Sequence, residues 1–269
     1  VKLSALGDIV HAMVVLQFIK KFNKEISIDW IVEEEYKDLL EFHKDIRKVH
    51  LVNLKRAKER KSFFLLLSEL KKVRKFGFYD LVIDMKGLIK SALISKIIRA
   101  PITIGFDKLS VRETTASLFY NKTFNYDYEK NVIERNIALI SFALGFSVTK
   151  KQIQNKIPFL HLSNKQLEIK LSNSKKNILL IPGSSQISKC YPSYKLAEVA
   201  SSLDANFFVI WGNDIEKIMA SHIKKLSHNV TICNKLQLHS LVLLISMVDL
   251  VIGPDTGPTP VSYTHLRAH

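Results

Sequence analysis

Four loops in this sequence combine residue types that bind or activate ligands, and each directly follows an apolar run with strand composition. The first loop, Ser4–Asp8, contains a glycine and ends in a carboxylate where a helical pattern begins. Asp is among the preferred residues at a helix N-cap, and for Asp8 taken alone capping is the favoured interpretation. A carboxylate between a strand and a helix is also placed to act as a general base on a bound hydroxyl. Asp8 is therefore both a candidate cap and a candidate base.

Of the other three loops, the last two have compositions that suit phosphate groups. Asp84–Leu88 is again a strand end with a glycine turn, and Pro182–Ser185 is followed by Lys189. Backbone N–H groups before a helix can hold a phosphate, and a nearby lysine adds a positive charge. On its own, the Pro182–Ser185 loop is weak evidence for a phosphate site, since a Walker A element and a G-x-G-x-x-G fingerprint are both missing. The fourth loop, Gly253–Thr259, places two glycines, two prolines and two threonines around one aspartate and suits a diphosphate-linked ligand.

Several other chemistries lack their motifs. The sequence has no Cys/His cluster with metal-ligand spacing, no G-x-S-x-G elbow and no Asp-x-Asp loop for a divalent ion. Its two cysteines, Cys190 and Cys233, are too few for a disulfide framework. His11, in the first helical stretch, is expected at a packing or surface position. We expect no metal, no cofactor and no nucleic-acid partner.

The charge balance points to an anionic partner. Lys and Arg number 40 against 25 Asp and Glu, a formal net charge of +15, although drift of the composition toward lysine explains such a surplus equally well. The run Lys55–Lys61, which includes Arg56 and Arg60, is basic. It precedes the apolar Phe63–Leu67, and a second basic run, Lys71–Lys75, follows. The pattern predicts a basic loop before an amphipathic helix, either as a solvated face or as a site for a phosphorylated lipid head group.

Short strand-like runs alternate with helical periodicity almost throughout, which is the pattern of parallel sheets built from βαβ units. In the first half the predicted strands are Val1–Leu3, Ser27–Val32, Val49–Val52, Leu81–Asp84 and Thr103–Gly105, and the predicted helices are Ile9–Phe22, Ser62–Phe76, Leu88–Ile98 and Val132–Leu144. In the second half the predicted strands are Asn177–Ile181, Phe207–Trp211, Val230–Cys233 and Leu250–Ile252, with helices Ser193–Leu203, Ile215–Leu226 and Leu238–Met247 between them.

The pattern predicts an α/β fold of two Rossmann-like, doubly wound domains whose strand ends face a central cleft. Between Gly145 and Lys176 it loosens into a polar linker, which gives domains 1–160 and 161–259. The chain opens inside a strand without a methionine, so a few preceding residues are expected to be missing. Residues 260–269 show no strand or helical period and are expected to be a non-native tail on a truncated second domain.

Motifs in both halves resemble glycosyltransferase family 9, the lipopolysaccharide heptosyltransferases. The matching segments, in the family's order, are Lys2–Ala12, Trp30–Glu34, Asp84–Ser91, Arg112–Glu113, Ala116–Asn121, Val132–Asn136, Lys189–Pro192, Trp211–Gly212 with Glu216, and Asp255–Gly257. The resemblance covers residues 1–259, and the strand end at Glu33 and Glu34 favours the branch that adds the first inner-core heptose. The family continues Asp-Thr-Gly-x-[ST]-His, but Pro260 stands where the histidine belongs, which we attribute to the tail.

This resemblance implies a GT-B fold with an N-terminal acceptor domain and a C-terminal domain that binds ADP-L-glycero-D-manno-heptose. It implies inverting, metal-independent transfer without a cofactor, with Asp8 as the general base on a hydroxyl of Kdo in the acceptor Kdo-lipid A. The implied donor-binding residues are Ser184, Ser185, Lys189, Glu216, Asp255, Thr256 and Gly257, and the implied acceptor-binding residues are Arg56, Arg60, Lys86 and Arg112.

The resemblance also implies a cytoplasmic enzyme, peripheral on the inner face of the cytoplasmic membrane of a Gram-negative bacterium. Two alternatives stay open. One is a family 9 transferase with a different acceptor, such as a heptosyltransferase II. The other is a non-catalytic protein that binds nucleotides or anionic lipids in the same two-domain cleft. Transfer of labelled ADP-heptose onto Kdo-lipid A distinguishes the three.

Overall fold

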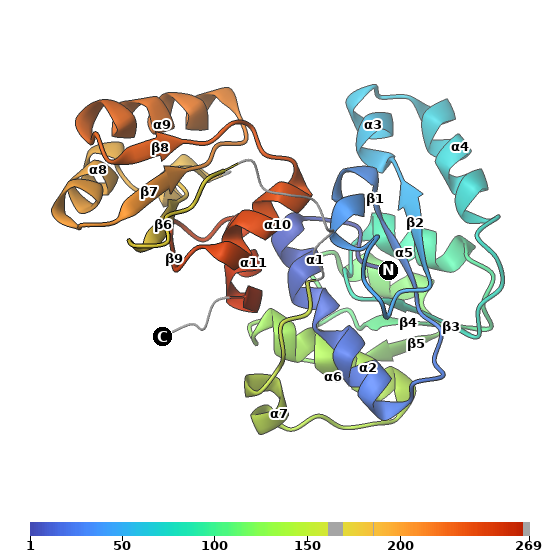
Figure 1. The fold of residues 1–269 in the computed structure, drawn as a ribbon. Helices are drawn as coiled ribbons and strands as arrows, with labels where there is room; N and C mark the ends of the chain where they lie inside the picture. The colour runs from blue at the N-terminus through green and yellow to red at the C-terminus, as the bar shows by residue number, and fades with distance from the viewer. Residues whose placement is uncertain (161–168, 185, 266–269) are drawn as a thin grey trace. The chain divides into compact units, whose positions relative to one another are not determined.

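The structure is a computed structural model in which residues 1–160, 169–184 and 186–265 are described. The chain divides into two compact units, Val1–Phe159 and Leu160–His269 (Figure 1). Each unit has parallel strands flanked by helices, as the α/β prediction requires. Within the described part of the chain, no helix combines the length and the apolar character needed to cross a membrane.

The strands of the first unit form two hydrogen-bonded groups. Strand β1 (Asp29–Glu33) pairs with β2 (Lys48–Val52). Strand β4 (Ile102–Phe106) pairs with both β3 (Leu81–Asp84) and β5 (Lys122–Phe124). All of these pairs are parallel.

Residues 1–3 join the two groups and act as the predicted central strand. On one side the Lys2 N–H donates to the Ile31 carbonyl (3.3 Å), and on the other the Val1 nitrogen donates to the Ile83 carbonyl (2.5 Å). When the six segments are numbered by their order in the chain, their order across the sheet is 3-2-1-4-5-6, which is the order of a doubly wound sheet. The order reverses between residues 1–3 and β3, and ligands bind at such a switch point, beyond the carboxyl ends of the strands.

The helices of the first unit are α1 (Leu6–Met13), α2 (Val15–Phe22), α3 (Leu54–Glu59), α4 (Phe63–Val73), α5 (Ile89–Ile97), α6 (Val132–Leu144) and α7 (Lys150–Gln154), with 3₁₀ turns η1 (Glu34–Leu39) and η2 (Thr114–Phe119). The helix predicted over Ile9–Phe22 is in fact two helices, with a break at Val14.

Helix α3 corrects the prediction of a basic loop over Lys55–Lys61. Its first turn is capped by Asn53, whose side chain accepts a hydrogen bond from the Arg56 N–H (3.2 Å). Leu54 and Ala57 are buried, so the segment has one apolar side at helical spacing and a basic outer side. A cap and two apolar contacts are sufficient to order one short helix here.

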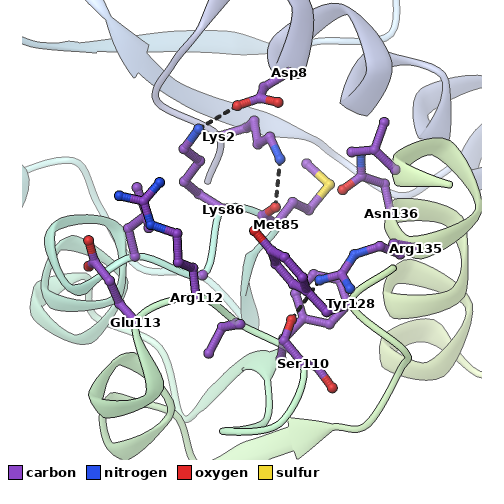
Figure 2. A pocket seen from close by; sticks show the side chains of 15 residues that line it. Lys2, Asp8, Met85, Lys86, Ser110, Arg112, Glu113, Tyr128, Arg135 and Asn136 are labelled. Carbon is purple, nitrogen blue, oxygen red and sulfur yellow. Dashed lines mark hydrogen bonds and ion pairs between the residues drawn. The ribbon is translucent and has the colours of Figure 1, made fainter. Parts of the chain in front are cut away.

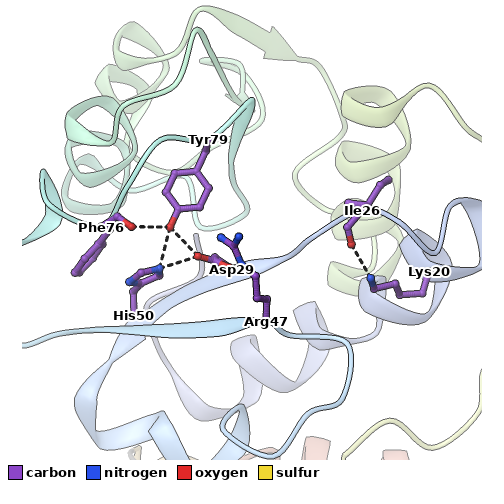
Figure 3. A network of polar contacts seen from close by, with 7 residues as sticks. All are labelled: Lys20, Ile26, Asp29, Arg47, His50, Phe76 and Tyr79. Carbon is purple, nitrogen blue, oxygen red and sulfur yellow. Dashed lines mark hydrogen bonds and ion pairs between the residues drawn. The ribbon is translucent and has the colours of Figure 1, made fainter.

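A polar network ties the amino end of β1 to its neighbours (Figure 3). Asp29 Oδ2 accepts a hydrogen bond from the Tyr79 hydroxyl (2.7 Å) and lies 2.9 Å from His50 Nε2. Arg47 Nε donates to the other oxygen of Asp29 (2.8 Å). Burial alone raises the pKa of Asp29, but the hydrogen bonds from Arg47, His50 and Tyr79 outweigh it and lower the pKa to about 2.

The second unit repeats the architecture with four parallel strands. Their order is β8 (Val230–Ile232), β7 (Asn206–Val209), β6 (Asn177–Leu180) and β9 (Leu250–Ile252). The connecting elements are η3 (Ile187–Lys189), α8 (Ser193–Ser202), α9 (Asp214–Leu226) and α10 (Leu238–Met247). When these strands are numbered by their order in the chain, their order across the sheet is 3-2-1-4. This sheet therefore has its switch point between β6 and β9.

The expectation that residues after Thr259 lack regular structure is wrong. Residues Pro258–His265 form helix α11, which packs against α10. Pro258 is the first helical residue, where its fixed φ favours a helix start and its missing N–H is not needed. Pro260 and Val261 are buried, so the segment contributes apolar contacts to the second unit.

Candidate functional site

An ion pair lies across the switch point of the first unit. Lys86, in the loop after β3, donates a hydrogen bond from Nζ to Oδ2 of Asp8, which lies in the first turn of α1, shortly after residues 1–3 (Figure 2). The side chain of Lys86 is 15% exposed and that of Asp8 is 38% exposed, so the pair is shielded on one side and open on the other. The structure thus brings together the predicted base and one predicted acceptor-binding residue.

The first turn of α1 holds Asp8 in place. Ala5, rather than Asp8, is the N-cap, and Asp8 is the third helical residue. Its Oδ2 accepts a hydrogen bond from the Ala5 N–H (3.4 Å), which is one half of a capping box. The interpretation of Asp8 as the cap itself is therefore wrong by three residues. Both hydrogen bonds reach Oδ2, and none from the described residues reaches Oδ1.

Asp84 holds the loop that carries Lys86. Its fully buried carboxylate accepts hydrogen bonds from the Lys86 N–H (2.8 Å) at Oδ1 and from the Tyr120 hydroxyl (2.7 Å) at Oδ2. Gly87 has a φ of +67°, and a Cβ there would lie 2.5 Å from Val111 Cγ1, so only glycine fits the turn. Asp84 stands in a loop that the sequence singles out, but no sequence pattern assigns Tyr120 a role.

Lys2 adds a buried positive charge beneath the ion pair, which the sequence did not predict. Its Nζ donates to the Met85 carbonyl (2.7 Å), and burial lowers the pKa of Lys2 to about 8. Burial also raises the pKa of Asp8, but the charge of Lys2 and the hydrogen bond from Lys86 outweigh it, so the net pKa of Asp8 is lowered. Asp8 is therefore an ionised carboxylate at neutral pH.

These groups line a cavity of about 320 Å³ that is rich in positive charge (Figure 2). Its cationic residues are Lys2, Lys86, Arg112 and Arg135, and its acidic residues are Asp8 and Glu113. Glu113 is partly engaged elsewhere, because its carboxylate accepts a hydrogen bond from the Ile89 N–H (2.7 Å) at the start of α5. A surplus of fixed positive charge in a cavity of this size fits a small anionic ligand.

The predicted acceptor-binding residues Arg56 and Arg60 do not line this cavity. Both are exposed on α3 and at its end. A second cavity, of about 540 Å³, lies beside this helix and is lined instead by Lys55, Lys58 and Lys61. The basic segment therefore presents lysines, not the two arginines, to a concave surface.

The switch point of the second unit also carries an ion pair. Lys189 Nζ, after β6, lies 3.2 Å from Asp255 Oδ2, after β9, and both side chains are exposed. Thr256 and Gly257 complete the loop before α11. Two loops that are far apart in the sequence thus meet at one edge of the sheet, as their positions after neighbouring strands predict.

Glu216 lies against the same edge. Its carboxylate accepts a hydrogen bond from the Gly212 N–H (2.6 Å), after β7. A Cβ on Gly183 would lie 2.2 Å from Glu216 Cγ, so a glycine in the loop after β6 is what allows this carboxylate to approach. Ser184 is half-buried in this loop, and Ser185 lies outside the described residues. In the part of the chain that is described, no group of three or more His, Cys, Asp or Glu side chains could hold a metal ion.

Comparisons with known proteins agree on one family. The family described as glycosyltransferase family 9 (heptosyltransferase) matches residues 68–266. Lipopolysaccharide heptosyltransferase 1 of Campylobacter coli is 37% identical over 277 residues, which cover 98% of this chain and 79% of the relative. The protein of the same name from Escherichia coli K12 is 26% identical over 265 residues, which cover 96% of this chain and 81% of the relative.

Two solved structures show the same fold. E. coli heptosyltransferase WaaC with ADP-2-deoxy-2-fluoro heptose has a TM-score of 0.81 at 22% identity, covering 98% of this chain and 84% of that chain. E. coli ADP-heptose lps heptosyltransferase II has a TM-score of 0.74 at 20% identity, with 98% and 81% covered. These likenesses confirm the predicted GT-B fold class.

Proposed function

The chain belongs to glycosyltransferase family 9, and from this premise we propose that it transfers L-glycero-D-manno-heptose from ADP-heptose to Kdo of Kdo-lipid A. The observation that carries the proposal is the ionised Asp8, held by Lys86 at a sheet switch point in a cavity with surplus positive charge. The Campylobacter coli relative is named for heptosyl transfer to lipopolysaccharide, and the WaaC structure contains an ADP-heptose analogue.

In the proposed reaction a hydroxyl oxygen of Kdo attacks the anomeric carbon of the heptose. The new C–O bond forms on the face opposite to the bond that breaks, and ADP leaves with the bonding electron pair. Asp8 accepts the proton of the attacking hydroxyl. Its lowered pKa keeps it ionised, and Oδ1, which has no partner among the described residues, is available for the proton.

The cavity supports an acceptor that carries carboxylates. Lys86 and Arg112 line it, and we assign both to acceptor binding, as the resemblance implies. Arginine binds a carboxylate with two parallel hydrogen bonds, which suits recognition of a sugar acid. For the lipid A phosphates we assign Lys55, Lys58 and Lys61, because these residues, unlike Arg56 and Arg60, line the second cavity.

The donor is assigned to the second unit. The diphosphate of ADP-heptose would replace Asp255 as the partner of Lys189, and the loops around Ser184, Ser185 and Thr256–Gly257 would provide hydroxyl and backbone N–H donors. Fixed donors of this kind offset the charge that develops on the leaving diphosphate. Glu216 would accept hydrogen bonds from the ribose hydroxyls.

An exposed apolar strip on α4 supports attachment to the inner face of the cytoplasmic membrane. Phe63 is 66% exposed, Phe64 is 83% exposed and Leu67 is 36% exposed. Basic residues of α3 precede the strip, and the basic run Lys71–Lys75 follows it. Aromatic side chains flanked by lysines are typical of helices that lie in an anionic membrane interface.

A transfer assay with three acceptor conditions tests the proposal. The chain is incubated with ADP-heptose and with Kdo-lipid A, with the same acceptor already carrying one heptose, or with no acceptor, and the products are identified by mass spectrometry. We expect one heptose on Kdo-lipid A only. Transfer only to the heptosylated acceptor would assign the second-heptose activity, and donor binding without any transfer would assign a non-catalytic role.

A further inference from the structure

Glu33, the last residue of β1, connects the strand that leads to Asp8 with helix α3. Its backbone N–H donates to the carbonyl of Leu3, in the central strand (3.1 Å). Its carboxylate Oε2 accepts a hydrogen bond from the N–H of Leu54, the first residue of α3 (3.1 Å). One residue, only 3% exposed, thus joins the segment of the proposed base to the basic helix.

Helix α3 needs such contacts to hold its position. It has only six residues, and a helix of this length is not stable by itself in water. The N–H groups at its amino end are bound by side chains from three places: Leu54 by Glu33 of β1, Asn53 by Glu69 of α4 (3.0 Å), and Arg56 by Asn53 (3.2 Å). The cap at Asn53 is internal to the segment, so the bond to Glu33 is the hydrogen bond that attaches the first turn to the sheet.

Glu33 is a buried acid without an ion pair, since none of the ion pairs among the described residues includes it. Burial raises the pKa of Glu33, and the charge of Lys90 and the N–H groups of Leu54 and Lys55 lower it only in part. A buried carboxylate without an ion-pair partner costs folding free energy. An acid at this position is therefore better explained by the helix that it holds than by the stability of the fold.

The cavity of about 540 Å³ beside α3 borders the same parts of the unit. Glu33 lines it together with Ser4, which follows the strand of residues 1–3. Three lysines of α3 and its carboxyl end also line the cavity: Lys55, Lys58 and Lys61. The residues of one short helix move together, so a displacement of its first turn would move all three ammonium groups relative to Ser4.

We propose that Glu33 is a positioning residue for the acceptor, which fixes the lysines of α3 relative to Asp8 without touching the substrate. In the proposed reaction the hydroxyl at Asp8 and the phosphates at the lysines belong to one molecule. The spacing between Asp8 and the lysines therefore selects the acceptor. The inference rests on the proposed function, because it takes the ligand of the cavity beside α3 to be the phosphorylated end of Kdo-lipid A.

The test substitutes Glu33 and uses Asp29→Asn as the control. Glu33→Ala removes the carboxylate, and Glu33→Gln keeps the size of the side chain and one oxygen that can accept the Leu54 N–H. Asp29 is also a carboxylate of β1 with a buried side chain (5% exposed), but it lies at the amino end of the strand and does not line the cavity.

Four quantities are measured for each variant. The KM is determined for Kdo-lipid A, for the same acceptor without its lipid A phosphates, and for ADP-heptose. Hydrogen exchange of the backbone amides of Leu54–Glu59 is followed by mass spectrometry, which reports on the attachment of α3 independently of activity.

We expect Glu33→Ala to raise the KM for Kdo-lipid A about 10-fold, the effect of losing one hydrogen bond to a charged group. The KM for the acceptor without phosphates and the KM for ADP-heptose should stay within about two-fold of the wild type. Exchange of the α3 amides should become faster. Glu33→Gln should lie between Glu33→Ala and the wild type, and Asp29→Asn should leave all three KM values unchanged.

Three results would contradict these expectations. A wild-type KM for Kdo-lipid A in Glu33→Ala, or equal increases for the acceptors with and without phosphates, would show that Glu33 has no role or only a structural one. Transfer by the wild type combined with unchanged amide exchange in Glu33→Ala would refute the inference alone. Absence of any transfer by the wild type to Kdo-lipid A would refute the proposed function and the inference with it.

Discussion

The contact between Gly105 and Tyr120 allows a prediction that joins packing to catalysis. Gly105 lies in β4, and a Cβ on it would lie 2.3 Å from Tyr120 Cε2 and 2.4 Å from Tyr120 Cζ. Gly105→Ala therefore forces the tyrosine ring to move. The ring cannot move far without breaking the hydrogen bond from its hydroxyl to Asp84 (2.7 Å), the residue that also holds the Lys86 N–H.

Two free-energy terms set the size of the effect. Overpacking a well-packed core costs about 1–3 kcal/mol, and a lost hydrogen bond to a buried charged group costs about 1.5–3 kcal/mol. Gly105→Ala should thus lower the free energy of unfolding by about 2.5–6 kcal/mol. Tyr120→Phe removes the hydrogen bond without the clash, and it should cost only about 1.5–3 kcal/mol. Both should lower kcat for heptosyl transfer, since the loop that carries Lys86 loses its support.

Urea unfolding and steady-state kinetics of both variants check these values. Gly145→Ala is the control, because a Cβ there meets nothing within 4 Å although the φ of +75° is strained. Gly145→Ala should lower the free energy of unfolding by about 1–2 kcal/mol and leave kcat unchanged. If Gly105→Ala is no more destabilising than Gly145→Ala, or if Tyr120→Phe keeps full stability and turnover, the support of the Lys86 loop by Asp84 is refuted.

Three further predictions concern metal, charge and pH. Saturating EDTA should leave turnover unchanged within about two-fold, because Lys189 and helix N-termini offset the leaving-group charge. Loss of activity in EDTA that is restored when Mg²⁺ is added back would contradict this prediction. Neutralising Lys55, Lys58 and Lys61 should raise the acceptor KM and weaken its salt dependence more than neutralising Arg56 and Arg60. The reason is that the three lysines, unlike the two arginines, line the cavity beside α3. Equal effects of the two variants would contradict this prediction. The pKa of Asp29 falls from 3.8 to about 2 on folding, so its stabilisation is complete above pH 3.8 and is lost as the pH falls toward 2. Asp29→Asn should flatten that part of the acid-unfolding curve measured by circular dichroism, and an unchanged curve would show that the network of Asp29 does not stabilise the unit.

The sequence predicted which site residues lie close together where their positions follow from the order of the strands. Asp8, Lys86 and Arg112 each follow the carboxyl end of a strand, and the segments after neighbouring parallel strands meet at one edge of the sheet. The loop after β6 and the loop after β9 likewise meet, at the ion pair between Lys189 and Asp255. What the sequence could not supply was the side on which each residue of the basic segment lies, because that depends on the cap at Asn53 and the burial of Leu54.

Other features depend on tertiary packing alone. Tyr120 contributes to the site because Gly105 leaves room for its ring, and no local pattern reports such a contact. Helix α11 forms from a segment without periodicity, because Pro258 starts it and Val261 is buried.

The most direct test of the central claim is the rate of heptosyl transfer by Asp8→Asn. The substitution keeps the shape of the side chain and removes its ability to take a proton. Loss of a general base lowers the rate about 10²- to 10⁴-fold, so kcat for transfer to Kdo-lipid A should fall by that factor. The affinity for ADP-heptose should stay within about three-fold, because Asp8 takes no part in donor binding in this account. A variant that keeps most of its turnover would show that Asp8 only completes the first turn of α1.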